Sequence, residues 1–320
     1  MHSPSHQVAA IHSIQAGALH IAYQALGPAA GPPVLLLHGF PYDILSYAAV
    51  GPRLAEAGCR VIVPWLRGFG ETRFLHPDTP RSGQQAALAY DALQLMDALH
   101  IPQAVVAGYD WGGRAACILA ALYPQRVRGL VSGLGYAIQN IAAAGQAASP
   151  EEEHKLWYQY YLHGARGAAG LQAQRYAFCR LLWQMWSPSW QFDEATYARS
   201  ASAFDNPDFV DVVLHSYRHR HGLAAGDPAL DGWEAALAQR PRITVPTIAI
   251  DGLDDGVAAA GGSAAHAPFF GPDFSRTLLP GIGHNLPQEA PAEFADAILE
   301  LLEKVCTSPS SQAAQRSDDP

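Results

Sequence analysis

The sequence predicts an α/β fold in which a mostly parallel central sheet carries helices on both faces and a helical cap is inserted between two parts of the core. Short apolar runs such as VLLL at 34–37 and VVA at 105–107 alternate with longer stretches of helical spacing. Strands that alternate with helices in this way form parallel sheets buried on both faces. The alternation stops near residue 136 and resumes near residue 241, which predicts the insertion.

Composition excludes several classes of function. The chain has 320 residues, of which 49% are hydrophobic and 15% are charged. Such a chain can bury a sizeable core and does not have the composition of a disordered protein. The formal net charge is −9 and no run of basic residues offsets it. This balance argues against nucleic acid as a partner.

Other sequence features predict a cytoplasmic protein. No apolar run reaches the ~18 residues of a membrane span, and residues 1–15 lack the pattern of a secretory signal. The four cysteines show neither metal nor disulfide spacing; they are Cys59, Cys117, Cys179 and Cys306. We expect them to be reduced core residues. The oligomeric state is left open, with a homodimer as one option.

The first part of the core is predicted over residues 1–135. Two short strands lie around QAG within 7–25, and further strands are expected at 34–38, 59–63, 103–108 and 126–133. Helices are expected at 45–57, 82–99 and 112–123. Gly58 and Pro124 are the predicted stops of the first and last of these helices, because glycine is favoured just after a helix and proline cannot continue one.

The helical cap is predicted over residues 136–240, where the chain is polar, helical in spacing and rich in aromatic residues. The second part of the core, 241–305, begins with the buried strand ITVPTIAIDG and continues with FSRTLLPGIGH as the last strand and its loop. A closing helix is expected at 291–304. Residues 306–320 are small and polar, which predicts a disordered tail.

The turn after the strand at 103–108 holds the main candidate for chemistry. It reads Gly108-Tyr109-Asp110-Trp111-Gly112, the pattern of a strand, a central nucleophile between two glycines, and a helix. The glycines permit a tight, strained turn that lifts the central side chain above the edge of the sheet. Asp110 is therefore a candidate nucleophile. The alternative is an ordinary helix N-cap, since Asp is favoured there.

Two other segments support the nucleophile. The early loop LLLHGFP at 35–41 can offer the backbone N–H of Phe40 beside that of Trp111, which together would form an oxyanion hole. Acidic residues follow a buried strand in IAIDGLDDGV, and His284 lies in a glycine-rich loop before the last helix. The order along the chain is then nucleophile, acid and base, which distinguishes one arrangement of such triads from the others.

On these residues the sequence resembles the α/β-hydrolase superfamily, over roughly residues 5–305. Within it, HGFP at 38–41 and the Asp110-Trp111 pair resemble the branch of epoxide hydrolases and dehalogenases. The resemblance implies that the triad acid stands three residues after the glycine that ends its strand. Counting from Gly252 gives Asp255, with Asp254 as the alternative.

An aspartate nucleophile predicts a particular chemistry. Its carboxylate is already ionised at neutral pH, since the reference pKa is about 3.9, and it suits attack on a strained or activated sp³ carbon. Attack would form an alkyl ester on Asp110. Water activated by His284 would hydrolyse this ester, with Phe40 and Trp111 holding the oxyanion and Asp255 orienting His284.

The predicted cap offers acids for opening an epoxide. Tyr158 in LWYQYYL and Tyr217 in VVLHSYRHR resemble the tyrosine pair of epoxide hydrolases, which protonates the opening ring. We therefore expect an epoxide hydrolase that uses water to convert an apolar aryl or alkyl epoxide to a vicinal diol, without a cofactor. The residues expected to bind substrate are His38, Pro41, Tyr161 and Trp183. For His38 a structural role in its loop is the alternative.

Two other functions remain open. A haloalkane or fluoroacetate-type dehalogenase would use the same Asp110, and Arg114 matches the fluoroacetate enzymes. However, Phe40 stands where haloalkane dehalogenases usually have Asn, and Trp111 stands where fluoroacetate dehalogenases have Arg. The second alternative is not an enzyme: it is a catalytically inactive relative of the α/β hydrolases that binds a ligand.

Three further motifs receive structural interpretations. His215 and His219 are four residues apart in HSYRHRH, but the intervening arginines would repel a cation, so we expect no metal. No P-loop or GxGxxG motif follows a strand, so no nucleotide cofactor is expected. Arg67 and Arg73, in LRGFGETRF, are expected to tie down a loop through backbone carbonyls.

Overall fold

A mixed sheet forms the centre of the molecule, as a computed structural model that describes residues 10–258 and 261–307 shows. The strand order is β1-β2-β4-β3-β6-β7-β8-β9, and β5 pairs with β2. The five pairs from β4 to β9 are parallel, whereas β1, β2 and β5 join in antiparallel register. The prediction of a mostly parallel sheet is confirmed.

The strands are short and mostly buried. They are β1 (Ile11–Ala16), β2 (Leu19–Leu26), β3 (Pro33–Leu37), β4 (Arg60–Pro64), β5 (Arg73–Phe74), β6 (Ala104–Gly108), β7 (Val127–Gly133), β8 (Thr247–Gly252) and β9 (Phe274–Leu279). Every residue of β6 and β8 is buried, because both faces of the central sheet are covered. The parallel strands end at one edge, so the loops that follow β3, β6 and β8 meet there.

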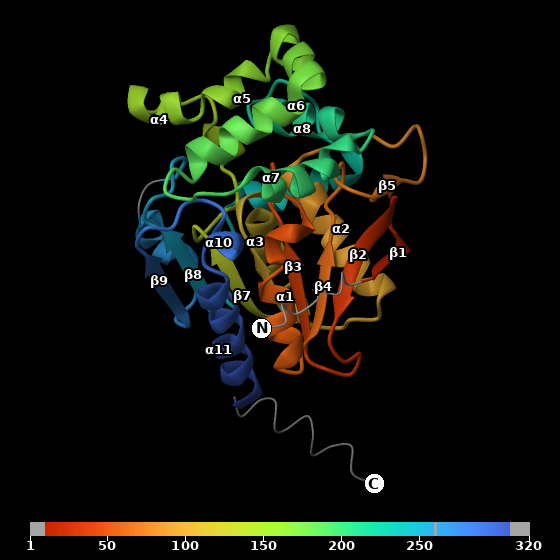
Figure 1. Cartoon of the computed structure of the whole chain (residues 1–320), viewed down its shortest axis with the longest axis vertical. Helices are drawn as coiled ribbons and strands as arrows, with labels where there is room; N and C mark the ends of the chain where they lie inside the picture. Colours follow the sequence, from red (N-terminus) through yellow and green to blue (C-terminus); the bar gives the residue numbers. More distant parts are fainter. Residues whose placement is uncertain (1–9, 259–260, 308–320) are drawn as a thin grey trace.

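Helices cover both faces of the sheet (Figure 1). One face carries α1 (Val50–Glu56) and α11 (Pro291–Thr307), and the other carries α2 (Gln85–Ala98) and α3 (Asp110–Leu122). A short helix, α10 (Leu286–Glu289), precedes α11. The core of the protein lies between these helices and the sheet.

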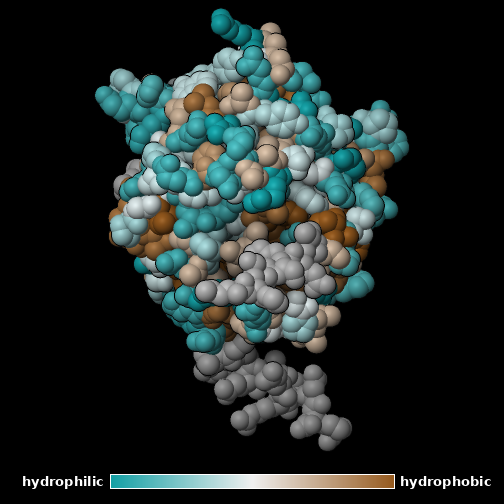
Figure 2. Space-filling model, in the orientation of Figure 1, coloured by the Kyte–Doolittle hydropathy of each residue, from teal (hydrophilic) through white to brown (hydrophobic). Residues whose placement is uncertain are grey.

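The end of the sheet where the parallel strands stop is covered by a layer of helices, drawn in green at the top of Figure 1. The layer comprises α4 (Pro150–Lys155), α5 (Trp157–Tyr161), α6 (Ala165–Trp186), α7 (Glu194–Ala201) and α8 (Phe209–His219). Hydrophilic residues cover much of its outer surface (Figure 2), and most of its aromatic rings pack against one another inside.

One helix of the predicted insertion packs elsewhere. α9 (Asp231–Ala238) falls within residues 136–240, but its Trp233 contacts the rings of Tyr90 on α2 and Tyr123 at the end of α3. The last part of the range therefore lies against the sheet-covering helices. The exact boundaries of core and cap stay predictions.

Three helices begin at residues other than those predicted from the sequence. The helix expected at 45–57 is divided into a 3-10 turn at Ile44–Tyr47 and α1, because Pro52 has no N–H and is tolerated only in the first turn of a helix. The helix expected at 82–99 starts at Gln85, since Ser82 and Gly83 bind Arg67 and His215. The helix expected at 112–123 begins earlier, at Asp110.

Of the predicted helix ends, that of the first helix agrees with the structure and that of the last helix does not. Gly58 follows α1 with φ +88°, a left-handed conformation suited to glycine. The closing helix extends to Thr307, so the predicted tail begins too early, and residues 308–320 lie outside the described part of the chain. Cys59, Cys117 and Cys179 are free and buried, which confirms that prediction; the side chain of Cys306 lies outside the description.

Among the described residues, no helix is both long enough and apolar enough to cross a membrane. The cytoplasmic location and the homodimer stay predictions.

Candidate active site

Asp110 stands at a strained turn between β6 and α3. Its φ is +51°, in the left-handed region that is costly for a residue with a Cβ. The neighbouring glycines allow the turn because no Cβ fits there. A Cβ on Gly112 would lie 2.0 Å from the Leu37 carbonyl oxygen, and one on Gly108 would lie 2.5 Å from the Gly112 backbone. The two glycines of the sequence pattern are therefore required by the close backbone contacts of this turn.

The carboxylate of Asp110 is held from two sides. The Phe40 backbone N–H donates to its Oδ1 over 2.8 Å, and His284 Nε2 lies 3.5 Å from its Oδ2. Burial alone would raise the pKa of this carboxyl, but His284, Arg114 and the Phe40 N–H outweigh burial and lower the pKa below its ordinary value. Asp110 is thus a carboxylate at neutral pH with one oxygen directed toward the imidazole.

His284 forms a short hydrogen bond to Asp255. The distance from Nδ1 to Asp255 Oδ2 is 2.7 Å, and both side chains are buried. The other oxygen of Asp255 accepts the backbone N–H groups of Val257 and Ala258, each over 2.8 Å. Asp254, the alternative acid, is exposed, so the structure favours Asp255 as the partner of His284.

The two carboxylates control the charge of the imidazole. Burial opposes a charged His284, but Asp255 and Asp110 more than offset it and raise the pKa of His284 to about 10. At neutral pH the resting triad therefore contains an imidazolium between two carboxylates. Part of this effect comes from Asp110 and depends on its negative charge.

The two predicted oxyanion donors lie beside Asp110. The Phe40–Pro41 peptide bond is cis, and Phe40 is fully buried. Trp111 is the second residue of α3, so its backbone N–H is one of the first four of a helix, which have no partner within the helix. The Phe40 and Trp111 rings stack with centroids 5.3 Å apart. This contact holds the two loops together.

Tyr158 and Tyr217 come from different helices and meet above Asp110. Their rings contact edge to face with centroids 5.3 Å apart, and Tyr217 also packs on Phe40. Both are buried, which raises the pKa of Tyr217 and raises that of Tyr158 to about 12 despite the nearby Arg220. Both phenols therefore keep their protons at neutral pH and can donate hydrogen bonds. Gln159 Nε2 donates to the Tyr158 oxygen over 3.1 Å.

A cavity of about 360 Å³ opens beside Asp110 and His284. This volume lies within the range of small-molecule sites. Its other lining residues are Arg114, Gly133, Leu134, Tyr136, Ala137, Tyr158, Gln159, Arg220, Asp251, Val257, Ala258, Gly262, Ser263 and His266. The cavity is therefore partly apolar and partly charged, whereas the substrate predicted from the sequence is apolar.

Four residues predicted to bind substrate do not line this cavity. His38 is buried and uses both ring nitrogens on backbone atoms of Gly39 and Leu66, which corresponds to the structural alternative. The carbonyl of Pro41 accepts the indole N–H of Trp183 over 2.7 Å. Tyr161 lines a different, more open cavity between α5 and α6. The sequence pattern could not show these contacts, because they join segments far apart in the chain.

Two lining arginines were not predicted as site residues. Arg114 stands one turn after Asp110 on α3, a spacing that places the two side chains on the same face and was a usable signal. Burial, together with the positive charge of Arg220, lowers the pKa of Arg114 to about 10. Arg220 ends α8 and had been interpreted only as repelling a metal ion. Its place in the cavity depends on how α8 packs.

The other sequence motifs have structural roles. His215 accepts the Gly83 N–H and contacts the Ala225 carbonyl, so both ring nitrogens are occupied. Arg73 donates to the carbonyls of Gly70 and Thr72, as expected for a loop anchor.

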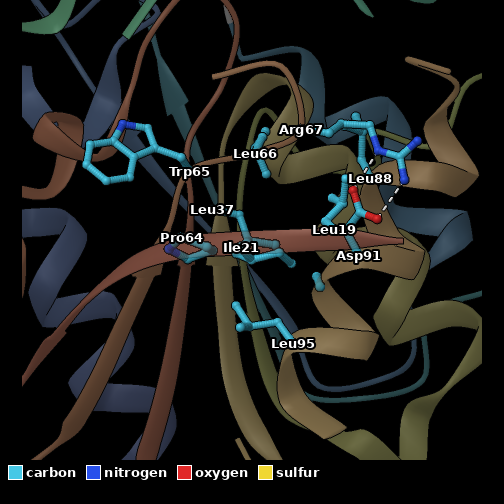
Figure 3. Close-up of a pocket in the computed structure, with 11 residues that line it drawn as sticks. Leu19, Ile21, Leu37, Pro64, Trp65, Leu66, Arg67, Leu88, Asp91 and Leu95 are labelled. Carbon is cyan, nitrogen blue, oxygen red and sulfur yellow. Dashed lines mark hydrogen bonds and ion pairs between the residues drawn. The ribbon is translucent and has the colours of Figure 1, made fainter. Parts of the chain in front are cut away.

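Arg67 also anchors its loop, through the Ser82 carbonyl and a salt bridge to Asp91 (Figure 3). The small cavity at this salt bridge is lined mainly by leucines and has a volume of about 10 Å³, which admits at most one water molecule. It is therefore no ligand site.

Comparison with known proteins decides the family. The model of the alpha/beta hydrolase fold family matches residues 32–268, which is most of the chain. The chain belongs to the α/β-hydrolase family. The triad order, the strained turn and the strand order all agree with this membership.

The solved structures and the curated relatives point to one branch of this family. A crystal structure from Klebsiella pneumoniae, of a protein named as a candidate epoxide hydrolase, is 47% identical with a TM-score of 0.90, and covers 91% of this chain and 96% of that one. Bifunctional epoxide hydrolase 2 of Sus scrofa is 37% identical over 102 residues, and epoxide hydrolase B of Mycobacterium tuberculosis is 32% identical over 144 residues. The matches cover 32% and 41% of this α/β hydrolase, and 18% and 40% of those two proteins. The predicted resemblance to the epoxide hydrolase branch is confirmed.

Proposed function

We propose that this α/β hydrolase is an epoxide hydrolase that adds water to an epoxide with an aryl or alkyl body and releases a vicinal diol. The observation that carries the proposal is the joint geometry of Asp110, His284 and Tyr158 at one cavity, with the Tyr217 ring in contact with Tyr158. An ionised carboxylate stands where a serine hydrolase would have its hydroxyl. Two protonated phenols stand where an alkoxide would form.

In the first step an Asp110 carboxylate oxygen attacks an epoxide carbon. The C–O bond of the ring breaks, and the ring oxygen takes a proton from Tyr158 or Tyr217. Because both phenols are buried and neutral, they are hydrogen-bond donors to the ring oxygen before the bond breaks. The product of this step is an alkyl ester of Asp110.

In the second step His284 activates water for attack on the ester. Formation of the ester removes the negative charge of Asp110, and this charge is one of the causes that raise the pKa of His284. The pKa of the imidazole therefore falls once the ester has formed. His284 then gives its proton to the phenolate left by the first step, which restores the tyrosine and makes the imidazole available as a base. Asp255 holds Nδ1, so that Nε2 faces the ester. The backbone N–H groups of Phe40 and Trp111 stabilise the oxyanion.

The covalent ester gives the sharpest test. We expect His284→Ala mixed with styrene oxide to gain the mass of one epoxide, because the ester forms but is not hydrolysed. Intact-protein mass spectrometry measures the gain, and peptide mapping locates it on Asp110. Asp110→Ala is the matched control and should gain nothing. An unmodified His284→Ala protein after exposure to several epoxides would contradict the proposal and favour a ligand-binding relative without turnover.

One observation supports a second candidate, dehalogenation with the same nucleophile. The indole N–H of Trp111 is buried next to Asp110 and has no hydrogen-bond partner among the described residues. An indole N–H is a suitable donor to a departing halide. The same mass-spectrometric experiment with a chlorinated alkane and with fluoroacetate, combined with measurement of released halide, separates the two functions. Halide release without any epoxide adduct would replace the proposal with dehalogenation.

A further inference from the structure

Several arginines of this protein pair with an acidic side chain. Arg67 is the most buried example: its Nε and Nη2 each donate over 2.6 Å to one oxygen of Asp91 (Figure 3). These two nitrogens form one edge of the planar guanidinium, and this edge matches the two oxygens of a carboxylate. Arg276 likewise pairs with Asp251. In these two cases a carboxylate binds the guanidinium group.

Arg220 is buried to the same degree without such a partner. It is 9% exposed, and its Nε and Nη2 have no hydrogen-bond partner among the described residues. Its third nitrogen, Nη1, lies 3.5 Å from the Gln159 Oε1, at the limit of a hydrogen bond. The edge that Arg67 uses to bind Asp91 is therefore empty in Arg220. Leaving charged donors unpaired in a buried position is costly unless a ligand completes them.

Arg220 lines the cavity that also contains Asp110 and His284. One face of the Arg220 guanidinium is covered by the ring of Tyr217, 4.4 Å from its centroid, which fixes the plane of the group. Gln159 lines the cavity beside it. A rigid guanidinium whose paired donors have no protein partner is suited to receive a carboxylate from a bound molecule.

The charges of the site favour the same conclusion. Asp110 and Asp255 carry two negative charges and the His284 imidazolium one positive charge. Arg114 and Arg220 add two positive charges to the same cavity, and neither forms an ion pair with a described side chain. The five groups therefore leave one positive charge in a buried site, because Asp251, which also lines the cavity, is paired with Arg276. A monoanionic substrate would neutralise it, whereas a neutral epoxide would not.

We propose that the substrate of this enzyme is an epoxide that carries a carboxylate, and that the guanidinium of Arg220 binds this carboxylate with Arg114 as the second positive charge. The inference rests on the proposed epoxide hydrolase function and specifies its substrate class. The apolar body of the molecule would lie along Leu134, Tyr136 and Val257, and its epoxide would face Asp110.

The test compares epoxides that differ only in charge. Phenylglycidate and its primary amide form one pair, and a series of ω-epoxyalkanoates with their amides varies the distance between carboxylate and ring. For the best carboxylate of the set, we expect wild-type kcat/KM to exceed that of its amide. Arg220→Gln should reduce this preference by about tenfold to a hundredfold, as expected for loss of a charged hydrogen-bonded pair. Arg218→Gln is the matched control, since Arg218 stands on the same helix, donates to the Leu162 carbonyl and does not line the cavity.

The ratio of kcat/KM for the carboxylate to kcat/KM for its amide distinguishes the possible roles of Arg220. If Arg220 only positions the Tyr217 ring or acidifies the phenols, the variant will lose activity on carboxylate and amide equally, and the inference is overturned. Equal wild-type activity on both members of every pair overturns it as well, while leaving the epoxide hydrolase function in place. Failure to hydrolyse any epoxide, charged or neutral, overturns the proposed function and the inference together.

Discussion

At the residue scale, the site depends on buried side chains that keep their charges because they contact one another. Asp110 accepts one backbone N–H and faces His284, which in turn is held by Asp255. Each group acquires its protonation state from its neighbours. The sequence could supply the residue types and their order. It could not supply the pKa shifts, because these depend on distances between segments far apart in the chain.

The two tyrosines should share one task. We expect Tyr158→Phe and Tyr217→Phe each to lower the rate of ester formation by roughly tenfold to a hundredfold, and the double variant to lower it by about 10² to 10⁴. The remaining phenol still donates in each single variant. Rapid-quench measurement of Asp110 alkylation checks this. Tyr160→Phe is the matched control. Tyr160 lies on α5 together with Tyr158, but it is exposed and donates a hydrogen bond to Glu153. Normal alkylation in the double variant would remove the tyrosines from the mechanism.

At the element scale, three strand ends and the start of α3 fix the site. β3 leads to Phe40, β6 to Asp110 and β8 to Asp255. α6 completes it from the helical layer, because the carbonyl of Trp186 accepts the N–H groups of Gly256 and His284. Strand periodicity predicted the first three elements well. The contribution of α6 was not predicted, since nothing in its sequence indicates which loop its last turn touches.

The tight approach of α3 to β3 gives a prediction at this scale. Gly112→Ala would place a methyl group 2.0 Å from the Leu37 carbonyl oxygen, so the backbone must shift. We expect a loss of about 1–3 kcal/mol in the free energy of unfolding and a lower kcat. Urea denaturation and steady-state kinetics measure the two effects. Gly145→Ala is the control, since a Cβ there contacts nothing within 4 Å. If both variants unfold at the wild-type midpoint, the close packing of this turn is not important for stability.

At the scale of the whole molecule, protonation of the triad is linked to folding. The pKa of His284 is raised from 6.5 to about 10, so its contribution to stability is complete below pH 6.5 and is lost as the pH rises toward 10. The pKa values of Asp110 and Asp255 are lowered from 3.8, so their contribution is lost as the pH falls below that value. The fold should therefore be most stable between these limits.

We expect the free energy of unfolding of the wild type to decrease between about pH 6.5 and 10, and this decrease to be much smaller in His284→Gln. Urea denaturation at a series of pH values measures both profiles. His76→Gln removes an exposed histidine and should retain the wild-type profile. Parallel profiles for wild type and His284→Gln would show that His284 does not titrate in this range.

Two differences between the prediction and the structure show what local sequence patterns cannot predict. Trp183 and Tyr161 were expected to bind substrate, but both pack away from Asp110. Arg220 was known only as part of a basic motif, yet it lines the cavity. Hydrophobic character predicts that a side chain is buried. It does not predict which neighbours surround it.

The sequence by itself determined the α/β class, the order of the strands along the chain, the glycine-flanked turn at Asp110, and the candidates for nucleophile, acid and base. These features depend on periodicity, glycine geometry and motif order, all of which are local. Only the tertiary structure decided which side chains line the cavity, which protonation states they hold, and that Arg220 lies there without an acidic partner in the described part of the chain. These properties arise from packing between α3, α5 and α8, whose residues are separated by tens of positions in the chain.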